Sequence, residues 1–341
     1  MHISEFDYEL PSELIAQQPL AGRDASRMLV LDRANQTWTD ASFKHFTDYL
    51  EPKDVVVVNN SRVIPARLRG TREETGGQVE IFLIRELEAK VWEALVRPGR
   101  RLKQASRVII AGGKLSAEIC DKPGSELRRV RFHCEGSFAE LLEEIGGTPL
   151  PPYIKRIDAE DRERYQTIYA KQRGAIAAPT AGLHFTPEVL RAIQQRASLA
   201  EVTLHVGYGT FEPVRVDDVD QHSVSAERFE ISEATAEKIN NASRSGGRVI
   251  VVGTTTMRAL ESSATDDGLV LAGTGEASLT IKPGYNFRVA DALLTNFHLP
   301  KSSLLILVSA FAGREFVLDA YRHAVRECYR FYSYGDCMFI L

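Results

Sequence analysis

Residues 55–62 read VVVVNNSR, and the expected fold changes within this stretch. Four consecutive valines are typical of a β-strand that is buried on both faces, as in the parallel sheet of an α/β protein. The polar residues that follow, Asn59 to Ser61, predict a turn. An α/β domain is therefore expected up to this turn, and a segment of a different kind begins after it.

Residues 61–147 predict a separate domain of short antiparallel strands. Glycine-containing breaks separate the alternating segments QVEIFLI, KVWEALV, SRVII, KLSAEI and LRRVRFHC, and a short helix in SFAELLEEIGG closes the domain. Several short strands at this spacing favour a small β-barrel or sandwich. From Ser61 to Cys134 there are 16 Lys and Arg against 9 Asp and Glu, a net charge of +7, although the whole chain carries −4. Such a domain either faces a polyanion or has a basic solvated surface.

From about Ala175 onward, predicted strands alternate with predicted helices. The strands are GAIAA, EVTLHV, GGRVIVVG, DALLTNF and GDCMFIL. Between them lie helical patterns such as the one from Pro187 to Arg196, with Thr186 as the predicted N-cap and Pro187 at the first helical position. This alternation predicts a mostly parallel sheet flanked by helices. The expected fold is therefore α/β, with residues 1–60 and 148–341 forming one discontinuous catalytic domain. The antiparallel β-barrel domain of residues 61–147 is inserted into it.

Composition excludes several classes of protein. The apolar run at 304–312 is far shorter than the roughly 20 residues of a membrane span, and the N-terminus lacks a basic-then-apolar signal pattern. We therefore expect a cytoplasmic protein without membrane association. The four cysteines form no CxxC pair, so the sequence predicts neither a zinc knuckle nor a disulfide framework.

Four loops that follow predicted strands carry small residues and hydrogen-bonding side chains. They are AAPTAGLHF (177–185), HVGYGTFEPV (205–214), GTTTMR (253–258) and TNFHLPKSS (295–303). Ligands of open α/β sheets bind beyond the carboxyl ends of the strands. Three of the loops contain a histidine: His184, His205 and His298. Each histidine alone is either a catalyst or a hydrogen-bonded packing residue, and their recurrence favours one shared crevice.

No motif predicts a metal or a permanently bound cofactor. HExxH spacing is absent, GTTTMR lacks the spacing and lysine of a phosphate-binding P-loop, and the GYG and GTG segments lack the third glycine of a dinucleotide fingerprint. Arg62, Arg67 and Arg69 suit either phosphate binding or a charged hinge at the domain junction. Asp336 lies in a predicted turn, where an aspartate is commonly structural.

The sequence resembles the S-adenosylmethionine:tRNA ribosyltransferase-isomerases of queuosine biosynthesis over nearly its full length. The stretches that carry the resemblance occur in the family's order: FDYELPSELIAQQPL, NNSRVIPARLRG, LPPYIKR, RYQTIYA, APTAGLHFT, VTLHVGYGTFEPVRV, VGTTTMRALES, PGYNFRVADALLTNFHLP and YRFYSYGDCMFI. The resemblance implies an α/β domain with an inserted β-barrel. It also implies transfer of the ribosyl part of S-adenosylmethionine to 7-aminomethyl-7-deazaguanine at the tRNA wobble position, with release of adenine and methionine.

The resemblance also suggests roles for particular residues. His184, His205, His298 and Asp336 are expected in catalysis, and Asn59, Arg62 and Arg67 at the tRNA. The substrate-binding set is Thr180, Gly182, Thr254, Thr255, Arg258, Asn296 and Tyr334. S-adenosylmethionine is expected as a co-substrate, tRNA as the partner, and a monomer as the oligomeric state.

Three positions depart from the family pattern. Where the family often has His-x-Met-His-x-Glu, this chain has His222 to Glu227 with Ser225 in place of the second histidine. Tyr208 replaces a small residue and Lys282 an aromatic one. Two rival hypotheses remain: a methyltransferase that uses the same co-substrate, although the glycine-rich loop expected after its first strand is missing, and an RNA-binding protein without catalysis.

Overall fold

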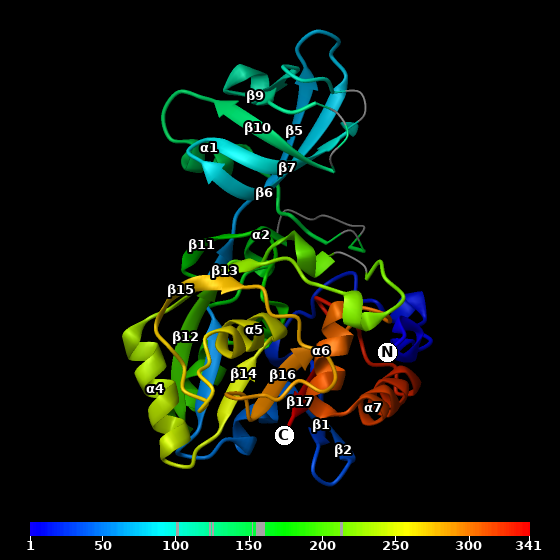
Figure 1. Ribbon diagram of the computed structural model, residues 1–341, viewed down its shortest axis with the longest axis vertical. Helices are drawn as coiled ribbons and strands as arrows, with labels where there is room; N and C mark the ends of the chain where they lie inside the picture. Colours follow the sequence, from blue (N-terminus) through cyan, green and yellow to red (C-terminus); the bar gives the residue numbers. More distant parts are fainter. Residues whose placement is uncertain (100–101, 123, 125, 152, 155–160, 212–213) are drawn as a thin grey trace. The chain divides into compact units, whose positions relative to one another are not determined.

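The chain divides into two compact units in its computed structural model (Figure 1), which describes residues 1–99, 102–122, 124, 126–151, 153–154, 161–211 and 214–341. Unit 1 comprises Met1–Arg62, Pro151–Gln172 and Ala178–Leu341, and unit 2 comprises Val63–Leu150 and Arg173–Ala177. Parts of two stretches quoted above, LPPYIKR and HVGYGTFEPV, lie outside the described residues.

A nine-stranded sheet forms the centre of unit 1, in the order β15-β13-β12-β3-β14-β16-β17-β1-β2. The four central strands β12, β3, β14 and β16 are parallel, and antiparallel pairs extend the sheet on both sides. This mixed sheet confirms the predicted α/β class. The strands are β1 (Arg27–Asp32), β2 (Thr37–Ser42), β3 (Val55–Asn59), β12 (Ser198–Leu204), β13 (Glu227–Ile231), β14 (Val249–Val252), β15 (Gly273–Ala277), β16 (Ala292–Asn296) and β17 (Cys337–Ile340).

The valine run of β3 is buried on both faces of the sheet, as predicted. Val55 and Val57 belong to one hydrophobic cluster, and Val56 and Val58 to another. Successive side chains of a strand point to opposite faces, so each face needs its own layer of helices. This is why an unbroken apolar run, and not an alternating one, marks the central strand.

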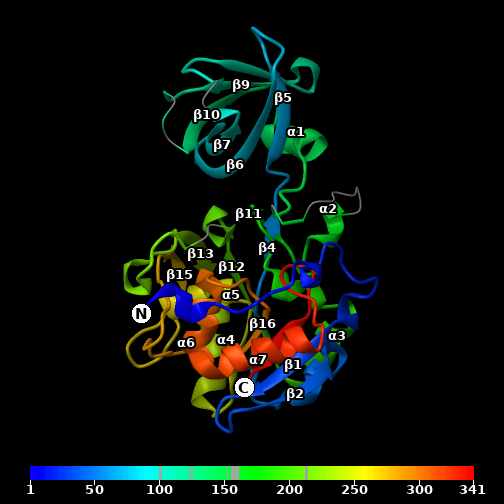
Figure 2. The same cartoon turned by 90° about the vertical axis from the view of Figure 1, so that its right-hand side faces the viewer.

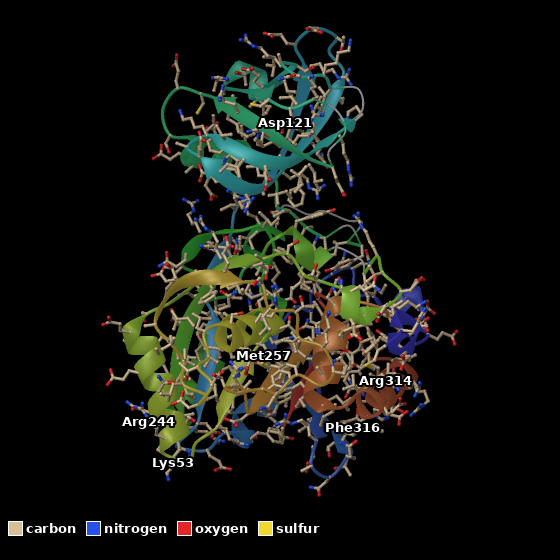
Figure 3. All side chains as sticks on the ribbon, in the orientation of Figure 1. Lys53, Asp121, Arg244, Met257, Arg314 and Phe316 are labelled. Carbon is tan, nitrogen blue, oxygen red and sulfur yellow. The ribbon has the colours of Figure 1, made fainter. Side chains whose placement is uncertain are left out.

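Helices cover the two faces through these clusters. The first cluster contains residues of α4, α5, α6 and α7, including Met257, which lies inside unit 1 (Figure 3). The second contains residues of α3 and of the 3-10 helix η4 (Phe43–Tyr49). The α-helices of unit 1 are α2 (Asp161–Arg164), α3 (Pro187–Arg196), α4 (Glu233–Arg244), α5 (Thr254–Ser262), α6 (Ser303–Ala312) and α7 (Arg314–Arg326).

The start of α3 shows how the local sequence fixes a helix. The Thr186 hydroxyl accepts a hydrogen bond from the Val189 backbone N–H at 3.3 Å, and Pro187 occupies the first helical position. Proline costs no helical hydrogen bond at this position, because the backbone N–H of the first helical residue has no partner inside the helix. The predicted cap and first residue of this helix are therefore confirmed.

Unit 2 is a closed barrel of six antiparallel strands, in the order β10-β7-β6-β5-β8-β9, which confirms the predicted barrel (Figures 1 and 2). Phe138 of α1 packs on Phe132, with ring centroids 5.0 Å apart, so the helix closes part of the barrel core. The strands are β5 (Arg67–Arg72), β6 (Gln78–Glu88), β7 (Val91–Arg97), β8 (Arg107–Ile110), β9 (Leu115–Ile119) and β10 (Leu127–His133); α1 spans Phe138–Ile145. Two further short strands are β4 (Ser61–Val63) and β11 (Gln172–Ala175).

Among the described residues, no helix combines the length and apolar character that crossing a bilayer requires.

Candidate functional site

Three of the four predicted loops lie at one edge of the sheet. The parallel strands β12, β14 and β16 end at Leu204, Val252 and Asn296, and the loops with His205, Thr254 and His298 follow them directly. The fourth loop is different, because AAPTAGLHF follows β11, which is outside the nine-stranded sheet. A hydrogen bond of 3.2 Å between His184 Nε2 and Asn296 Oδ1 nevertheless attaches this loop to the end of β16.

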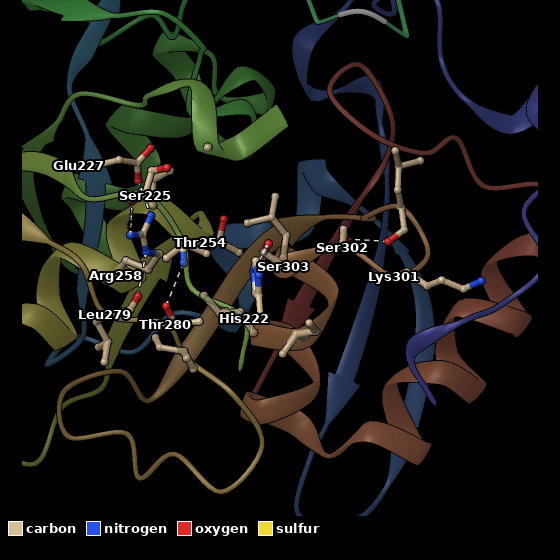
Figure 4. Close-up of a pocket in the computed structure, with 18 of the residues that line it drawn as sticks. His222, Ser225, Glu227, Thr254, Arg258, Leu279, Thr280, Lys301, Ser302 and Ser303 are labelled. Atoms are coloured by element: carbon tan, nitrogen blue, oxygen red, sulfur yellow. Dashed lines mark hydrogen bonds and ion pairs between the residues drawn. The ribbon is translucent and has the colours of Figure 1, made fainter. Parts of the chain in front are cut away.

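A cavity of about 150 Å³ opens at this edge (Figure 4). Its polar wall includes His222, Ser225, Glu227, Thr254, Arg258 and Ser303, and its apolar wall includes Ile281, Leu299 and Leu307. These residues come from the β13 and α5 region, from the start of α6 and from the loops between. We call it the larger cavity.

A buried ion pair forms one side of the larger cavity. The Arg258 guanidinium donates to a Glu227 carboxylate oxygen, to the Leu279 carbonyl at 3.2 Å and to the Ser225 carbonyl at 3.2 Å. The other Glu227 oxygen accepts the Gly207 N–H at 2.8 Å. Arg258 is therefore held by protein groups, and it shapes the wall while Glu227 balances its charge.

One imidazole lines the larger cavity, and it is His222. Its Nε2 lies 2.7 Å from Ser303 Oγ at the start of α6, and the side chain is half-buried (Figure 4). From the sequence, this segment was interpreted only as a departure from the family pattern. The sequence shows a histidine followed five residues later by a glutamate, and only the structure reveals that this glutamate is buried beside Arg258.

Tyr332 also lines the larger cavity, in a backbone conformation that is rare for a bulky residue. Its φ is 74°, and its backbone N–H donates to the Phe297 carbonyl at 3.1 Å. Such conformations cost energy and concentrate at functional sites.

Thr254 and Thr255 line the larger cavity at the N-terminus of α5, where the sequence predicted ligand contacts. Gly253 precedes them with φ 89°, a value that favours glycine and allows the sharp change from strand to helix. The buried Thr255 hydroxyl has no hydrogen-bond partner among the described residues, so it can accept or donate a bond to a ligand. Arg258 lies one turn further on the same helix.

A second, smaller cavity of about 20 Å³ surrounds His184. The His184 ring lies between Ser26 Oγ, 2.8 Å from Nδ1, and Asn296 Oδ1, 3.2 Å from Nε2. Asn296 donates its amide N–H to the Tyr332 carbonyl at 2.9 Å, so its oxygen accepts from Nε2–H and Nδ1 accepts from Ser26. Burial lowers the pKa of His184 to about 4, and the ring is neutral at pH 7.

The other two predicted histidines line neither cavity. His298 is buried, with Nε2 3.0 Å from Thr295 Oγ1, and burial lowers its pKa to about 3. His205 is half-buried, its buried Nδ1 has no hydrogen-bond partner in the part of the chain that the structure describes, and burial lowers its pKa. The structure therefore brings His184 and the β16 loop together, but it does not gather the three imidazoles around one of these two cavities.

Asp336 connects two segments of the backbone. Its carboxylate oxygens accept N–H groups from Arg27 and Arg330, both at 2.8 Å, and burial raises its pKa. These bonds join the start of β1 to the segment before β17.

The remaining predicted substrate residues surround the smaller cavity or support its backbone. Tyr334 lines this cavity. Thr180 begins the 3-10 helix η7 (Thr180–His184) and lines neither cavity. A side chain at Gly182 would lie 2.1 Å from the Tyr169 hydroxyl, so only glycine fits there.

The three residues predicted for tRNA contact have partners within the protein. Asn59 is buried, and its oxygen accepts the Leu204 N–H at 3.0 Å. Arg62 pairs with Glu163 at 2.9 Å, and in unit 2 Arg67 pairs with Glu80 at 3.1 Å. Arg62 and Arg67 each keep part of the side chain exposed.

Only one of the three departures from the family pattern reaches the larger cavity. Ser225 is part of its wall. Lys282 donates to the Asp220 carbonyl at 2.8 Å, and Tyr208 begins the 3-10 helix η8 (Tyr208–Phe211) beside the lining residue Gly209. Within the part of the chain that the structure describes, no cluster of three or more His, Cys, Asp or Glu could hold a metal ion.

The family model described as queuosine biosynthesis protein matches residues 3–340 of the chain. This chain belongs to the queuosine biosynthesis family. Membership explains why the motifs of the sheet edge occur together and in order.

Two relatives of this family show how far the similarity extends. The S-adenosylmethionine:tRNA ribosyltransferase-isomerase of Natranaerobius thermophilus is 51% identical over 342 residues, which cover 100% of this chain and 99% of the relative. A crystal structure of the S-adenosylmethionine tRNA ribosyltransferase from Thermotoga maritima is 38% identical, with a TM-score of 0.57, and the match covers 99% of this chain and 100% of the other.

Proposed function

We propose that the protein transfers and isomerises the ribosyl part of S-adenosylmethionine. The acceptor is 7-aminomethyl-7-deazaguanine at the tRNA wobble position, and the products are epoxyqueuosine-tRNA, adenine and methionine. The full-length match at 51% identity to a relative that carries this activity in its name supports the proposal most strongly. S-adenosylmethionine is a co-substrate, and no permanently bound cofactor is needed.

The larger cavity is the proposed site of the nucleoside part of S-adenosylmethionine. It lies at the carboxyl edge of the parallel strands, where α/β sheets bind ligands. Thr254 and the unpartnered hydroxyl of Thr255 offer hydrogen bonds, and the apolar wall suits an adenine ring. The Tyr332 side chain lines the same cavity and would attract the positively charged sulfur.

The chemistry starts at the sulfonium of the co-substrate. The positive sulfur acidifies the adjacent ribose C5′ hydrogen, and a general base removes this hydrogen as a proton to leave an ylide. Rearrangement of the ylide expels adenine, which takes up a proton. The aminomethyl nitrogen of the tRNA base then forms a bond to the sugar, and methionine leaves with the electron pair of the broken carbon–sulfur bond.

His222 and His184 are the best placed proton carriers in this scheme. His222 lines the larger cavity, and His184 is neutral at pH 7 and lines the smaller one. A neutral imidazole close to a reacting carbon suits general base catalysis. We propose that the backbone at the same edge of the sheet is positioned by His205, His298 and Asp336.

The tRNA is proposed to bind through the basic barrel and through the partly exposed Arg62 and Arg67 near the domain junction, and buried Asn59 is proposed to hold the backbone of that segment in place. The division into residues 1–60 with 148–341 and residues 61–147 is proposed to separate catalysis from RNA contact. A monomer is sufficient, because both described cavities are built from unit 1 alone. A cytoplasmic location would give the protein access to tRNA.

Product analysis tests this function. The protein is incubated with S-adenosylmethionine and a tRNA that bears 7-aminomethyl-7-deazaguanine, and the nucleosides and small molecules are separated. Equal amounts of adenine, methionine and epoxyqueuosine are expected. S-adenosylhomocysteine would indicate a methyltransferase, and tRNA binding without consumption of the co-substrate would indicate a binding protein.

A further inference from the structure

We propose that the smaller cavity is an oxyanion subsite, in which Arg23 and Arg164 bind either the carboxylate of the methionyl group or a phosphodiester of the tRNA. The inference rests on the proposed function and adds a binding group that neither the motifs nor the larger cavity supplied. Both guanidinium groups line the cavity, together with His184, Ser26, Ser333 and Tyr334.

The Arg23 and Arg164 guanidinium groups of the smaller cavity donate to backbone carbonyls and not to a described carboxylate. Arg23 donates to the carbonyls of Leu183, at 3.3 Å, and Glu163, at 3.2 Å, and Arg164 donates to the Leu20 carbonyl at 3.2 Å. Neither forms an ion pair with a described Asp or Glu. The Glu163 carboxylate forms its ion pair with Arg62 instead.

Arg330 adds a third positive charge near the same ring. Its Nη2 donates to the Gln18 carbonyl, and the charges of Arg164 and Arg330 both act on His184. The Asp336 carboxylate, whose charge acts on Arg330, accepts two backbone N–H groups. The local charge of this cluster is therefore positive.

Two of these guanidinium groups have a buried donor without an acceptor. Arg164 Nη1 and Arg330 Nη1 are both shielded from solvent and make no hydrogen bond to the described residues. Buried donors in proteins are almost always hydrogen-bonded, so each of these groups can take a further acceptor. Arg164 is the one of the two that lines the smaller cavity, and its planar guanidinium matches a carboxylate or a phosphate.

The smaller cavity has the right size and place for such a group. Its volume of about 20 Å³ admits little more than one or two oxygen atoms, so the rest of the ligand must lie outside it. Tyr332 lines the larger cavity and Ser333 the smaller one, so consecutive residues separate the two. We place the charged end of a ligand bound in the larger cavity beside this segment, toward Arg23 and Arg164.

Equilibrium binding with single variants tests the subsite. The affinity of Arg164→Gln and Arg164→Lys for S-adenosylmethionine is measured by calorimetry, and their affinity for tRNA by filter binding. Arg322→Gln serves as the control, because it removes the same charge from an exposed residue that pairs with Asp319. Melting temperatures establish that each variant is folded.

The two sources of the oxyanion give different results. If the carboxylate binds here, Arg164→Gln weakens S-adenosylmethionine binding by roughly 10- to 100-fold and leaves tRNA binding within twofold. A decarboxylated analogue then binds equally to wild type and variant. If a phosphodiester binds here, tRNA affinity falls instead, and the salt dependence of tRNA binding loses the contribution of about one phosphate.

Two outcomes would overturn the subsite. One is Arg164→Gln binding both ligands as tightly as Arg322→Gln does. The other is an equal loss of both affinities together with a lower melting temperature, which would make Arg164 a structural residue. Because binding needs no turnover, a wild-type protein that releases no adenine would refute the proposed function and still leave this test intact.

Discussion

At the scale of single residues, burial keeps the imidazoles of the sheet edge neutral. It lowers the pKa of His184 to about 4 and that of His298 to about 3, and it lowers that of His205 as well. A histidine in this state accepts a proton at physiological pH without first losing one. His222 is the imidazole that lines the larger cavity, where the nucleoside is proposed to bind.

Replacement of His222 by asparagine is expected to lower turnover by about 10²- to 10⁴-fold, the usual contribution of a general base or acid. The melting temperature and tRNA affinity should change little, because His222 is only half-buried. Single-turnover release of adenine is the measurement, and His45→Asn, at an exposed position, is the control. Wild-type turnover in the His222 variant would remove this residue from the mechanism.

His184→Gln should alter how stability depends on pH. The folded pKa of about 4 lies below the ordinary value of 6.5, so the unfolded chain takes up the proton first as pH falls. The stabilisation is complete above pH 6.5 and is lost between 6.5 and 4, by about 3 kcal/mol at most. Urea unfolding at pH 7, 5.5 and 4 should show a shallower loss in the variant, and parallel curves would contradict the assignment.

At the scale of secondary-structure elements, buried ion pairs connect the ends of strands and helices. Glu227 at the start of β13 and Arg258 of α5 form one such connection. Asp54, before β3, forms another by accepting N–H groups from the Arg248 backbone and side chain. The first pair joins β13 to α5 at the cavity edge, and the second joins the start of β3 to the start of β14 at the opposite end of the strands.

Arg258→Met is expected to lower the free energy of unfolding by about 3–5 kcal/mol, because Glu227 would remain buried without its partner. The double variant Glu227→Met with Arg258→Met should recover much of this loss. Denaturant unfolding of both single variants and the double variant measures the coupling. Strict additivity of the two losses would show that the pair does not act as a unit.

Asp54→Asn should destabilise the protein at neutral pH and not in acid. Burial alone would favour the neutral acid, but the hydrogen bonds and charge of Arg248 keep the pKa of Asp54 below its ordinary value. Its stabilisation is present above about pH 4 and is lost as pH falls through the lower folded pKa. The deficit of the variant, about 1–3 kcal/mol at pH 7, should shrink below pH 3, and Asp319→Asn is the exposed control. A constant deficit at all pH values would argue against the charged form.

Sequence patterns predicted the elements whose signal is local. The valine run identified β3, and Thr186 with Pro187 identified the start of α3. The strands β5 (RLRGTR) and β15 (GTGEA) carry no apolar alternation, and they were not predicted. Pairing with neighbouring strands of the sheet is what makes them strands. His222 and Tyr332 were not predicted to share a cavity, because they are 110 positions apart and tertiary packing brings them together.

At the scale of the whole molecule, the charge is divided between the two units. The net charge of +7 between Ser61 and Cys134 falls within the segment that forms the barrel. The acidic residues already counted in this net charge pair with cations inside unit 2, as Asp121 does with Arg129 and Glu93 with Arg85, and buried Arg128 donates to backbone carbonyls. The exposed cations Arg107 of β8 and Arg131 of β10, which lie on either side of Glu118 of β9, are candidates for contact with a polyanion.

tRNA binding should therefore weaken steeply with salt, because each phosphate contact releases counterions. In the double variant Arg107→Gln with Arg131→Gln, the slope of log affinity against log salt should be smaller by up to about 1.8. Arg322→Gln, in unit 1, should leave the slope unchanged. A flat salt response of the wild-type protein would count against RNA contact through the barrel.

Removal of the C5′ hydrogen is the central step of the account, and the fate of deuterium tests it directly. The protein is given S-adenosylmethionine with two deuterium atoms at the ribose C5′ and tRNA bearing 7-aminomethyl-7-deazaguanine, and the modified nucleoside is analysed by mass spectrometry. The account predicts that one of the two labels is lost to solvent and that adenine is released in equal amount. A transferred sugar that keeps both labels, or both labels retained in S-adenosylhomocysteine, would contradict it.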